Sequence, residues 1–269
     1  MAWTWAAFTP HPPIAVPEVG QGREQEAAVT LGGLTELQKR LRQMPEQGRP
    51  DVLLLLSPHQ PYAQGAFYLN SAPELNGDLR RFGAPEVGFN LKSSPRLVEF
   101  GRHLAGHGLE IGLADMKNLS TDHGSIVPLY FLAQAFGGPP PVVVGNPVGL
   151  SPADSLAFGR ALATWERGDE KWALLASGDL SHRMSRDGPY GFHPEGPLFD
   201  QDVIKAFESN TPEELIEKWP LSRLEEAGEC GFRSALAMMG LCGRAVEVLS
   251  HEAPFGVGYA VAWWVNNAA

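Results

Sequence analysis

The stretch WALLASGDLSH, residues 172–182, joins an uninterrupted apolar run to a cluster of polar and ionisable side chains. Its apolar part, residues 172–176, predicts a strand that is buried on both faces, as in the parallel sheet of an α/β protein. A simple turn would continue with Gly, Asn or Pro, whereas this chain places Asp179 and His182 directly after the strand. We therefore predict that both are working groups of a site at the strand end, and that Gly178 lets another segment approach closely.

Two further apolar strands end in the same way. Residues 3–9 are followed by His11 in the segment TPHPP, and residues 51–56 are followed by His59 in LLLLSPHQP. The prolines prevent each strand from continuing within a sheet. In an open α/β sheet, ligands bind outside the carboxyl ends of the strands, where loops from distant parts of the chain converge. We therefore expect His11, His59 and His182 to share one edge of the sheet.

Strands and helices alternate along the rest of the chain. We predict strands at residues 109–114, 142–145 and 256–264, and helices at residues 23–44, 95–107, 152–167, 199–209, 212–218 and 232–242. Residues 65–92, rich in Gly, Pro and Asn, indicate a hairpin or long loop that forms one wall of a pocket. This alternation is typical of the α/β class. We expect a single domain over residues 1–269, with a central, largely parallel or mixed sheet flanked by helices and an active site at the strand ends.

The composition excludes several kinds of partner. The formal net charge is −10 and the basic residues are scattered among acidic ones, which argues against a nucleic-acid-binding surface. No apolar stretch approaches the ~20 residues of a membrane span, and the first residues lack the basic segment of a secretory signal. The two cysteines, Cys230 and Cys242, form no CxxC pair and indicate a reducing compartment. We expect a soluble, cytoplasmic protein that acts on a small molecule, without nucleic-acid or membrane partners.

The histidines at the sheet edge suggest a metal site. A lone loop histidine is usually a surface residue or a local hydrogen-bond partner, and we assign that role to His103, His107, His193 and His251. His11 and His59, both flanked by proline after a strand, together favour metal binding, and His123 lies in another candidate loop before an apolar helical run. Two imidazoles and one carboxylate hold Fe(II) with open positions for substrate and dioxygen. Glu229 is the candidate carboxylate, although the helix dipole also explains an acid at a helix start; the adjacent Cys230 is either a small buried residue or a soft ligand.

These segments resemble the class III extradiol ring-cleavage dioxygenases related to the catalytic β subunit of protocatechuate 4,5-dioxygenase, with the Memo-like proteins as relatives. The matching segments are HPP at 11–13, SPH at 57–59, DHG at 122–124, SGDLSH at 177–182 and the acid at 229. They come in the family's order, and the resemblance spans nearly the whole chain. It implies that His11, His59 and Glu229 are the Fe(II) ligands, and that His182 is the acid/base residue beside the substrate and dioxygen.

The resemblance also implies roles for two more residues and leaves alternatives open. His123 would position the substrate hydroxyl or assist proton transfer, and Asp179 would orient His182 or line the site. In Memo-like proteins a cysteine replaces the metal-binding acid, and this sequence offers both residues side by side, Glu229 and Cys230. We expect an Fe(II)-dependent dioxygenase that opens the ring of a catechol-type or 2-aminophenol-type substrate with O2. The alternatives are a Memo-like metal- or peptide-binding protein without ring cleavage and a zinc hydrolase. A homo-oligomer and a small accessory subunit are both left open.

Overall fold

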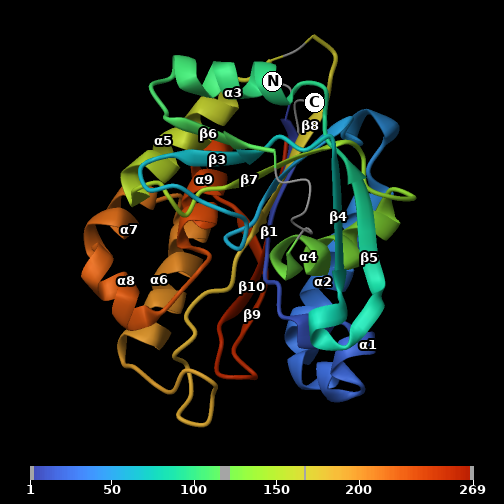
Figure 1. Cartoon of the computed structure of the whole chain (residues 1–269). Coiled ribbons are helices and arrows are strands. Elements are labelled where there is room, and N and C mark those ends of the chain that lie inside the picture. Colours follow the sequence, from blue (N-terminus) through green and yellow to red (C-terminus); the bar gives the residue numbers. More distant parts are fainter. Residues whose placement is uncertain (1–2, 116–121, 167, 267–269) are drawn as a thin grey trace.

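The computed structural model describes residues 3–115, 122–166 and 168–266, and its centre is an eight-stranded mixed sheet (Figure 1). The strands lie in the order β6-β3-β7-β2-β8-β1-β10-β9. Their bounds are β1 (Trp3–Thr9), β2 (Val52–Leu56), β3 (Phe67–Asn70), β6 (Ile111–Ala114), β7 (Val142–Asn146), β8 (Trp172–Ser177), β9 (Glu247–Glu252) and β10 (Tyr259–Val265). Two further strands, β4 (Glu74–Leu79) and β5 (Ala84–Lys92), form an antiparallel hairpin outside this sheet.

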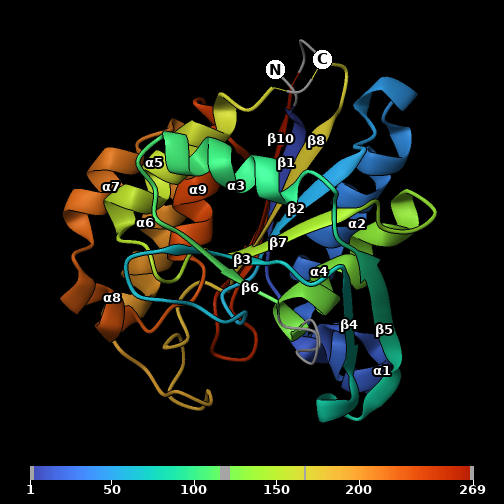
Figure 2. The ribbon, with the colours of Figure 1, turned by 45° about the horizontal axis from the view of Figure 1, so that its top comes forward.

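Helices cover both faces of the sheet (Figures 1 and 2). On one face the core includes residues of α3 (Leu97–Gly106), α5 (Pro152–Ala163), α6 (Glu195–Ser209), α7 (Pro212–Lys218), α8 (Leu221–Ala227) and α9 (Phe232–Cys242). On the other face it includes α2 (Ala28–Gln43), α4 (His123–Leu132) and the β4–β5 hairpin, and α1 (Pro17–Gly20) is a single turn. Successive strand residues point to opposite faces, so Leu54 joins the first core and Leu55 the second. This two-sided burial explains the unbroken apolar runs of the strands.

The α/β fold with a mixed, helix-flanked sheet is confirmed, and β1, α7 and α9 have the predicted bounds. Four elements were missing from the prediction: α1, β3, β9 and α8. Residues 65–92 form the expected hairpin but also give β3 to the main sheet, between β6 and β7. β9 is an edge strand of mixed polarity, without the apolar run that marks a buried strand. None of the described helices is long and apolar enough to cross a membrane. The single domain over residues 1–269 stays a prediction.

The three strands that lead to the predicted site are neighbours. β8 lies between β1 and β2 and is parallel to both. Thr9 pairs with Ser177, and Leu56 pairs with Ala176, so the three strands end at nearly the same level of the sheet. The segments that follow them therefore leave the sheet side by side at one edge, as ligand sites of open α/β sheets require.

Candidate metal centre

His11 lies just beyond β1 and is almost completely buried, with 1% of its surface exposed. Its ring Nδ1 lies 2.8 Å from the Ser177 hydroxyl at the end of β8. Its backbone N–H donates a hydrogen bond to Oδ1 of Asp179 at 2.9 Å. A hydrogen bond to one ring nitrogen fixes the orientation of a histidine and leaves the other nitrogen for a ligand. The parallel pairing of β1 and β8 thus sets both the position of His11 and the direction of its Nε2.

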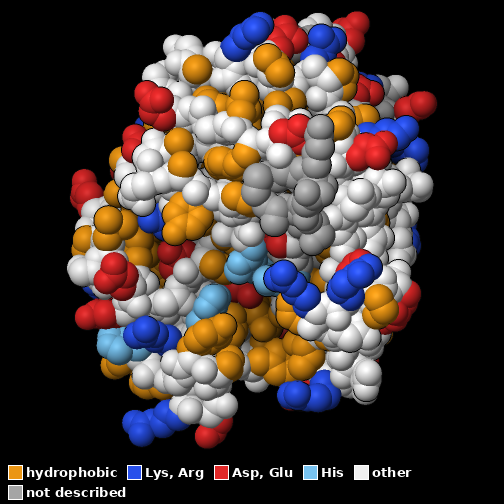
Figure 3. Space-filling view, viewed as in Figure 1, with side chains coloured by type: hydrophobic (Ala, Val, Ile, Leu, Met, Phe, Trp, Pro, Cys, Tyr) orange, Lys and Arg blue, Asp and Glu red, His pale blue; other side chains and the backbone are white. Residues whose placement is uncertain are grey.

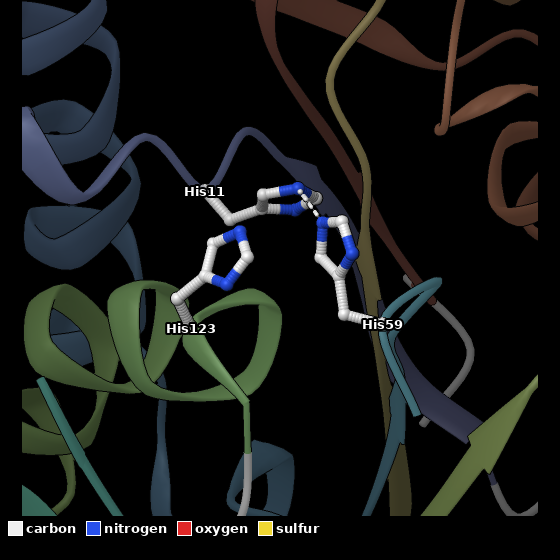
Figure 4. Close-up of side chains that lie close together, drawn as sticks. All are labelled: His11, His59 and His123. Carbon is white, nitrogen blue, oxygen red and sulfur yellow. Dashed lines mark hydrogen bonds between the residues drawn. The ribbon is translucent and has the colours of Figure 1, made fainter. Parts of the chain in front are cut away.

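Two more imidazoles meet His11, and their rings point toward one another in Figure 4. The Nε2 atoms of His59 and His11 are 3.0 Å apart. The rings of His59 and His123 are stacked with centroids 4.2 Å apart. One ring nitrogen of each of the three residues lies within 4.8 Å of the others. Two nitrogens bound about 2.1 Å from one ion at right angles are about 3.0 Å apart, so the spacing of His11 and His59 fits a shared metal ion.

Asp122 ties His123 to the loop that carries His59. It is the N-cap of α4, and its side chain accepts a hydrogen bond from the backbone N–H of Ser125 at 2.9 Å. The same carboxylate accepts hydrogen bonds from the Ser57 hydroxyl at 2.7 Å and from the Gln60 side chain at 2.9 Å. Asp122 has the local sequence signal of a helix N-cap, because an Asp that directly precedes an apolar helical run is typical of that position.

A second potential ligand group shares His11 with the first and consists of His11, Asp179 and Cys230. The His11 Nε2 is 3.8 Å from Oδ2 of Asp179 and 3.6 Å from Sγ of Cys230. The backbone N–H of Asp179 donates to the thiol at 3.3 Å. A Cβ added to Gly178 would lie 2.2 Å from the Cα of Gly231. The predicted close approach at Gly178 is thereby confirmed, and it brings the start of α9, with Cys230, against the end of β8.

Glu229 lies outside both groups. Its carboxylate accepts the backbone N–H of Phe232 at 2.6 Å and lies 3.7 Å from Nη1 of Arg233. Acidic side chains are favoured at a helix N-terminus because they accept the free N–H groups and face the positive end of the dipole. The structure therefore does not bring Glu229 to His11 and His59 as expected from the sequence, and the side chain that faces His11 from this segment is Cys230.

A cavity of about 520 Å³ opens over the histidines. Its ionisable lining consists of His11, His59, His123, Asp179, His182 and Tyr259, and its apolar and aromatic lining consists of Pro12, Pro13, Ile14, Val19, Phe82, Tyr190 and Val257. Figure 3 shows hydrophobic side chains gathered beside histidines near the centre of this face. The volume accommodates a single aromatic ring, since ligand pockets typically measure about 300–1,000 Å³. Phe82 lies in residues 65–92, the segment expected to form one wall of a pocket, whereas the sequence carried no signal for Tyr190 and Tyr259, which enter the cavity through tertiary packing.

His182 lines the cavity and has a buried ring nitrogen that is unpaired within the described structure. Its Nε2 is buried and has no hydrogen-bond partner among the described residues, and its ring stacks on Tyr190 with centroids 5.0 Å apart. Its backbone N–H donates to the carbonyl of Gly228 at 2.8 Å, which holds the loop in place. Within the described part of the chain no hydrogen bond joins the side chains of Asp179 and His182. Asp179 lines the cavity, and its carboxylate accepts the backbone N–H of His11.

Burial keeps the imidazoles of His11, His123 and His182 neutral. Desolvation, followed by the charges of His59 and His182, holds the pKa of His11 well below its usual value, and desolvation with the charges of His11, His59 and Arg81 lowers the pKa of His123 to about 3. The pKa of His182 is also lowered by burial, against the opposing charge of Asp179. Metal ligands bind in their deprotonated form. His11 and His123 are therefore ready to bind an ion, whereas burial raises the pKa of Cys230, so its thiol must first lose a proton.

The sequence was compared with known proteins. Protein CA_C1420 of Clostridium acetobutylicum is 34% identical over 266 residues, which cover 94% of this chain and 55% of that protein, so the chain spans about half the length of that relative. The 2-aminophenol 1,6-dioxygenase beta subunit of a Pseudomonas species is 25% identical over 287 residues, covering 96% of this chain and 92% of the subunit.

The fold and the family follow from two further comparisons. The crystal structure of the uncharacterized protein JW3007 from Escherichia coli K12 has the same fold, with a TM-score of 0.64 and 15% identity over 97% of this chain and 99% of that chain. Residues 5–262 match the family described as the catalytic LigB subunit of aromatic ring-opening dioxygenase. Because this match takes in the strands, the histidines and the cavity described above, the chain belongs to the family of catalytic LigB subunits of aromatic ring-opening dioxygenases.

Proposed function

We propose that the protein is a non-haem Fe(II)-dependent extradiol dioxygenase that opens the ring of a catechol-type or 2-aminophenol-type substrate with O2. The observation that carries this proposal is the cluster of three imidazoles, His11, His59 and His123, which line a cavity of about 520 Å³. The family match and the relative named as a 2-aminophenol dioxygenase support the substrate class. That relative is named a beta subunit, so an accessory subunit is a further element of the proposal.

His11 and His59 would hold the iron, since their Nε2 atoms already have the spacing of two ligands of one ion. A third donor is available from each of the two groups that share His11: His123 in one, Asp179 and Cys230 in the other. Bound Fe(II) would supply charge stabilisation and a template for the substrate oxygens and dioxygen.

His182 is the proposed acid/base residue. Its buried Nε2 faces no protein partner among the described residues and is therefore free to accept a proton from a substrate hydroxyl and to return it later. Asp179 acts on this step from a distance, because its charge opposes the lowering of the His182 pKa by burial. Tyr190, stacked on His182, and the apolar lining restrict the access of water to that nitrogen.

The test is an oxygen-uptake assay after anaerobic reconstitution with Fe(II), over a panel of catechols and 2-aminophenol. We expect the wild type to consume oxygen with at least one of them, and His182→Gln to lose about 100-fold or more in kcat with its iron retained. His107→Gln is the matched control, because His107 lies beyond the end of α3 and does not line the cavity. If His182→Gln turns over like the wild type, His182 is not the acid/base residue.

The ligand set is tested separately by metal content. His11→Ala and His59→Ala should lose the metal, and Glu229→Gln should retain it, because the Glu229 carboxylate is engaged by Phe232 and Arg233. His123→Ala and Cys230→Ser then show whether the third donor comes from His123 or from the group of Asp179 and Cys230. Iron loss in Glu229→Gln, with its melting temperature unchanged, would restore the ligand set expected from the sequence.

One observation favours a second function. Cys230, and not Glu229, lies beside His11, which is the arrangement of a Memo-like protein that binds a metal or a peptide without cleaving a ring. This alternative predicts metal binding that depends on Cys230 and no oxygen uptake with any member of the panel. The oxygen electrode and the Cys230→Ser metal content together decide between the two functions.

A further inference from the structure

Two large aromatic side chains are exposed although they line the cavity. Phe82 is 40% exposed and Tyr190 is 63% exposed. Phe67, Phe100 and Phe158, in contrast, are completely buried. Exposed aromatic rings that line a cavity offer apolar surface that a bound ligand can cover.

Each of these rings packs against a different histidine of the site. Phe82 lies edge-on to His123, with centroids 5.2 Å apart and an interplanar angle of 64°. Tyr190 stacks on His182, with centroids 5.0 Å apart and an angle of 30°. Phe82 therefore contacts His123 of the metal cluster, and Tyr190 contacts His182, the proposed acid/base residue.

The two rings come from separate segments on two sides of the site. Phe82 ends a short 3-10 helix, Arg80–Phe82, at the turn of the β4–β5 hairpin, and Leu79 and Val87 of that hairpin pack with residues of α4. Tyr190 lies in the loop between β8 and α6. In both ribbon views, the hairpin turn and this loop lie at the same end of the molecule, on either side of the turn that joins β9 and β10 (Figures 1 and 2).

The loop of Tyr190 is anchored at both ends. The backbone N–H of Met184 donates to the carbonyl of Gly256 at 3.0 Å, and Met184 forms an isolated β-bridge with Phe192. The backbone N–H of His193 donates to the carbonyl of Arg183 at 3.1 Å. Tyr190 thus belongs to a loop whose two ends are joined by hydrogen bonds, and Phe82 belongs to a hairpin. Both segments hold their rings at fixed places on the cavity wall.

We propose that Phe82 and Tyr190 form an aromatic clamp that selects a planar aromatic ring and holds it over His11 and His59. The inference rests on the proposed function for the identity of that ring as a catechol or 2-aminophenol. Aromatic pairs attract each other beyond the area that they bury. Two rings at the mouth, from the His123 side and from the His182 side, therefore favour a flat ring over a puckered one of the same size.

The test is the affinity for 4-nitrocatechol, measured without oxygen by optical titration of the iron-loaded protein. Phe82→Leu and Tyr190→Leu should each bind this probe up to about tenfold more weakly, with unchanged iron content and melting temperature. Phe82→Tyr and Tyr190→Phe keep a ring and should bind within about twofold of the wild type. Tyr62→Leu is the control, since Tyr62 is 59% exposed but does not line the cavity.

The outcomes separate the clamp from the proposed function. Equal affinity of the wild type and both leucine variants would overturn the clamp, even if the wild type consumes oxygen. Binding by the wild type that weakens in the leucine variants, without oxygen uptake by any of them, would support the clamp and overturn the dioxygenase proposal. Weakened binding in Tyr190→Phe equal to that in Tyr190→Leu would assign the effect to the hydroxyl and not to the ring, and would also overturn the clamp.

Discussion

Replacing Gly178 by alanine tests the contact that brings α9 to the metal centre. The added Cβ would lie 2.2 Å from the Cα of Gly231 and 3.2 Å from its backbone nitrogen. Both are backbone atoms, so no side chain can rotate away to make room. The end of β8 and the start of α9 must then move apart, which also separates Cys230 from His11.

The expected loss of folding stability in Gly178→Ala is near the upper end of the range for overpacked sites. Insertion of a methyl group into a well-packed region costs about 1–3 kcal/mol, and the backbone contact at Gly178 indicates about 3 kcal/mol. For a chain of this size that corresponds to a fall in melting temperature of roughly 6 to 12 °C. The sign of the change in stability is informative. Gly→Ala at an unstrained position with open space stabilises a protein by about 0.4–1 kcal/mol, because it reduces the conformational entropy of the unfolded chain.

The assay is thermal unfolding followed by circular dichroism, with Gly32→Ala as the matched control. Gly32 lies within α2, and no atom lies within 4 Å of a Cβ built there, so this variant should be stabilised slightly. If Gly178→Ala melts together with the wild type while Gly32→Ala behaves as expected, the close approach of Gly178 and Gly231 does not hold α9 against β8, and the placement of Cys230 has another cause.

Three further predictions concern the residues behind and within the site. Asp200 is completely buried and accepts hydrogen bonds from Ser181 N–H at 2.8 Å and His251 Nε2 at 2.9 Å. Asp200→Ala should therefore lower the free energy of unfolding by about 2–3 kcal/mol in urea titrations. An unchanged urea midpoint would contradict this prediction. Burial raises the pKa of Asp200, so the folded state holds that proton more tightly, and the stability advantage of the wild type over Asp200→Asn should decrease as the pH rises from the ordinary carboxyl pKa to the raised one. Metal at about 100 times its Kd should add about 2.7 kcal/mol of stability, visible as a higher melting temperature that chelator reverses and that His59→Ala lacks.

The part of the site that the sequence predicts is the part that regular structure determines. β1, β2 and β8 are apolar runs of obvious strand character, and each is followed by a candidate residue within a short segment. Once these strands lie parallel and adjacent, His11, His59 and Asp179 must meet at one sheet edge. Their proximity therefore follows from local patterns together with a general rule for α/β sheets.

The part that the sequence does not predict depends on contacts between distant segments. Phe82 reaches the cavity because the β4–β5 hairpin packs on α4, and Tyr259 reaches it because β10 pairs with β1. Neither contact has a local sequence signal. β9 was missed for a related reason: as an edge strand with exposed positions, it lacks the apolar run that marks the central strands.

Glu229 shows how a local and a tertiary role compete for one position. An acid just before an apolar helix is the pattern both of a metal ligand on a helix and of a helix-terminal acceptor. In the structure the Phe232 N–H and Arg233 satisfy its carboxylate locally, and the next residue, Cys230, is turned toward His11 by the glycine contact between β8 and α9. The identity of the third metal ligand therefore depends on whether a bound ion stabilises the site by more than the loss of these two local interactions. A carboxylate that leaves a helix N-terminus forfeits typically 0.3–1 kcal/mol of dipole stabilisation. A bound ion draws Glu229 into the site only if it gains more than this loss by binding the carboxylate in place of the Cys230 thiolate, and the metal content of Glu229→Gln and Cys230→Ser reports which residue binds it.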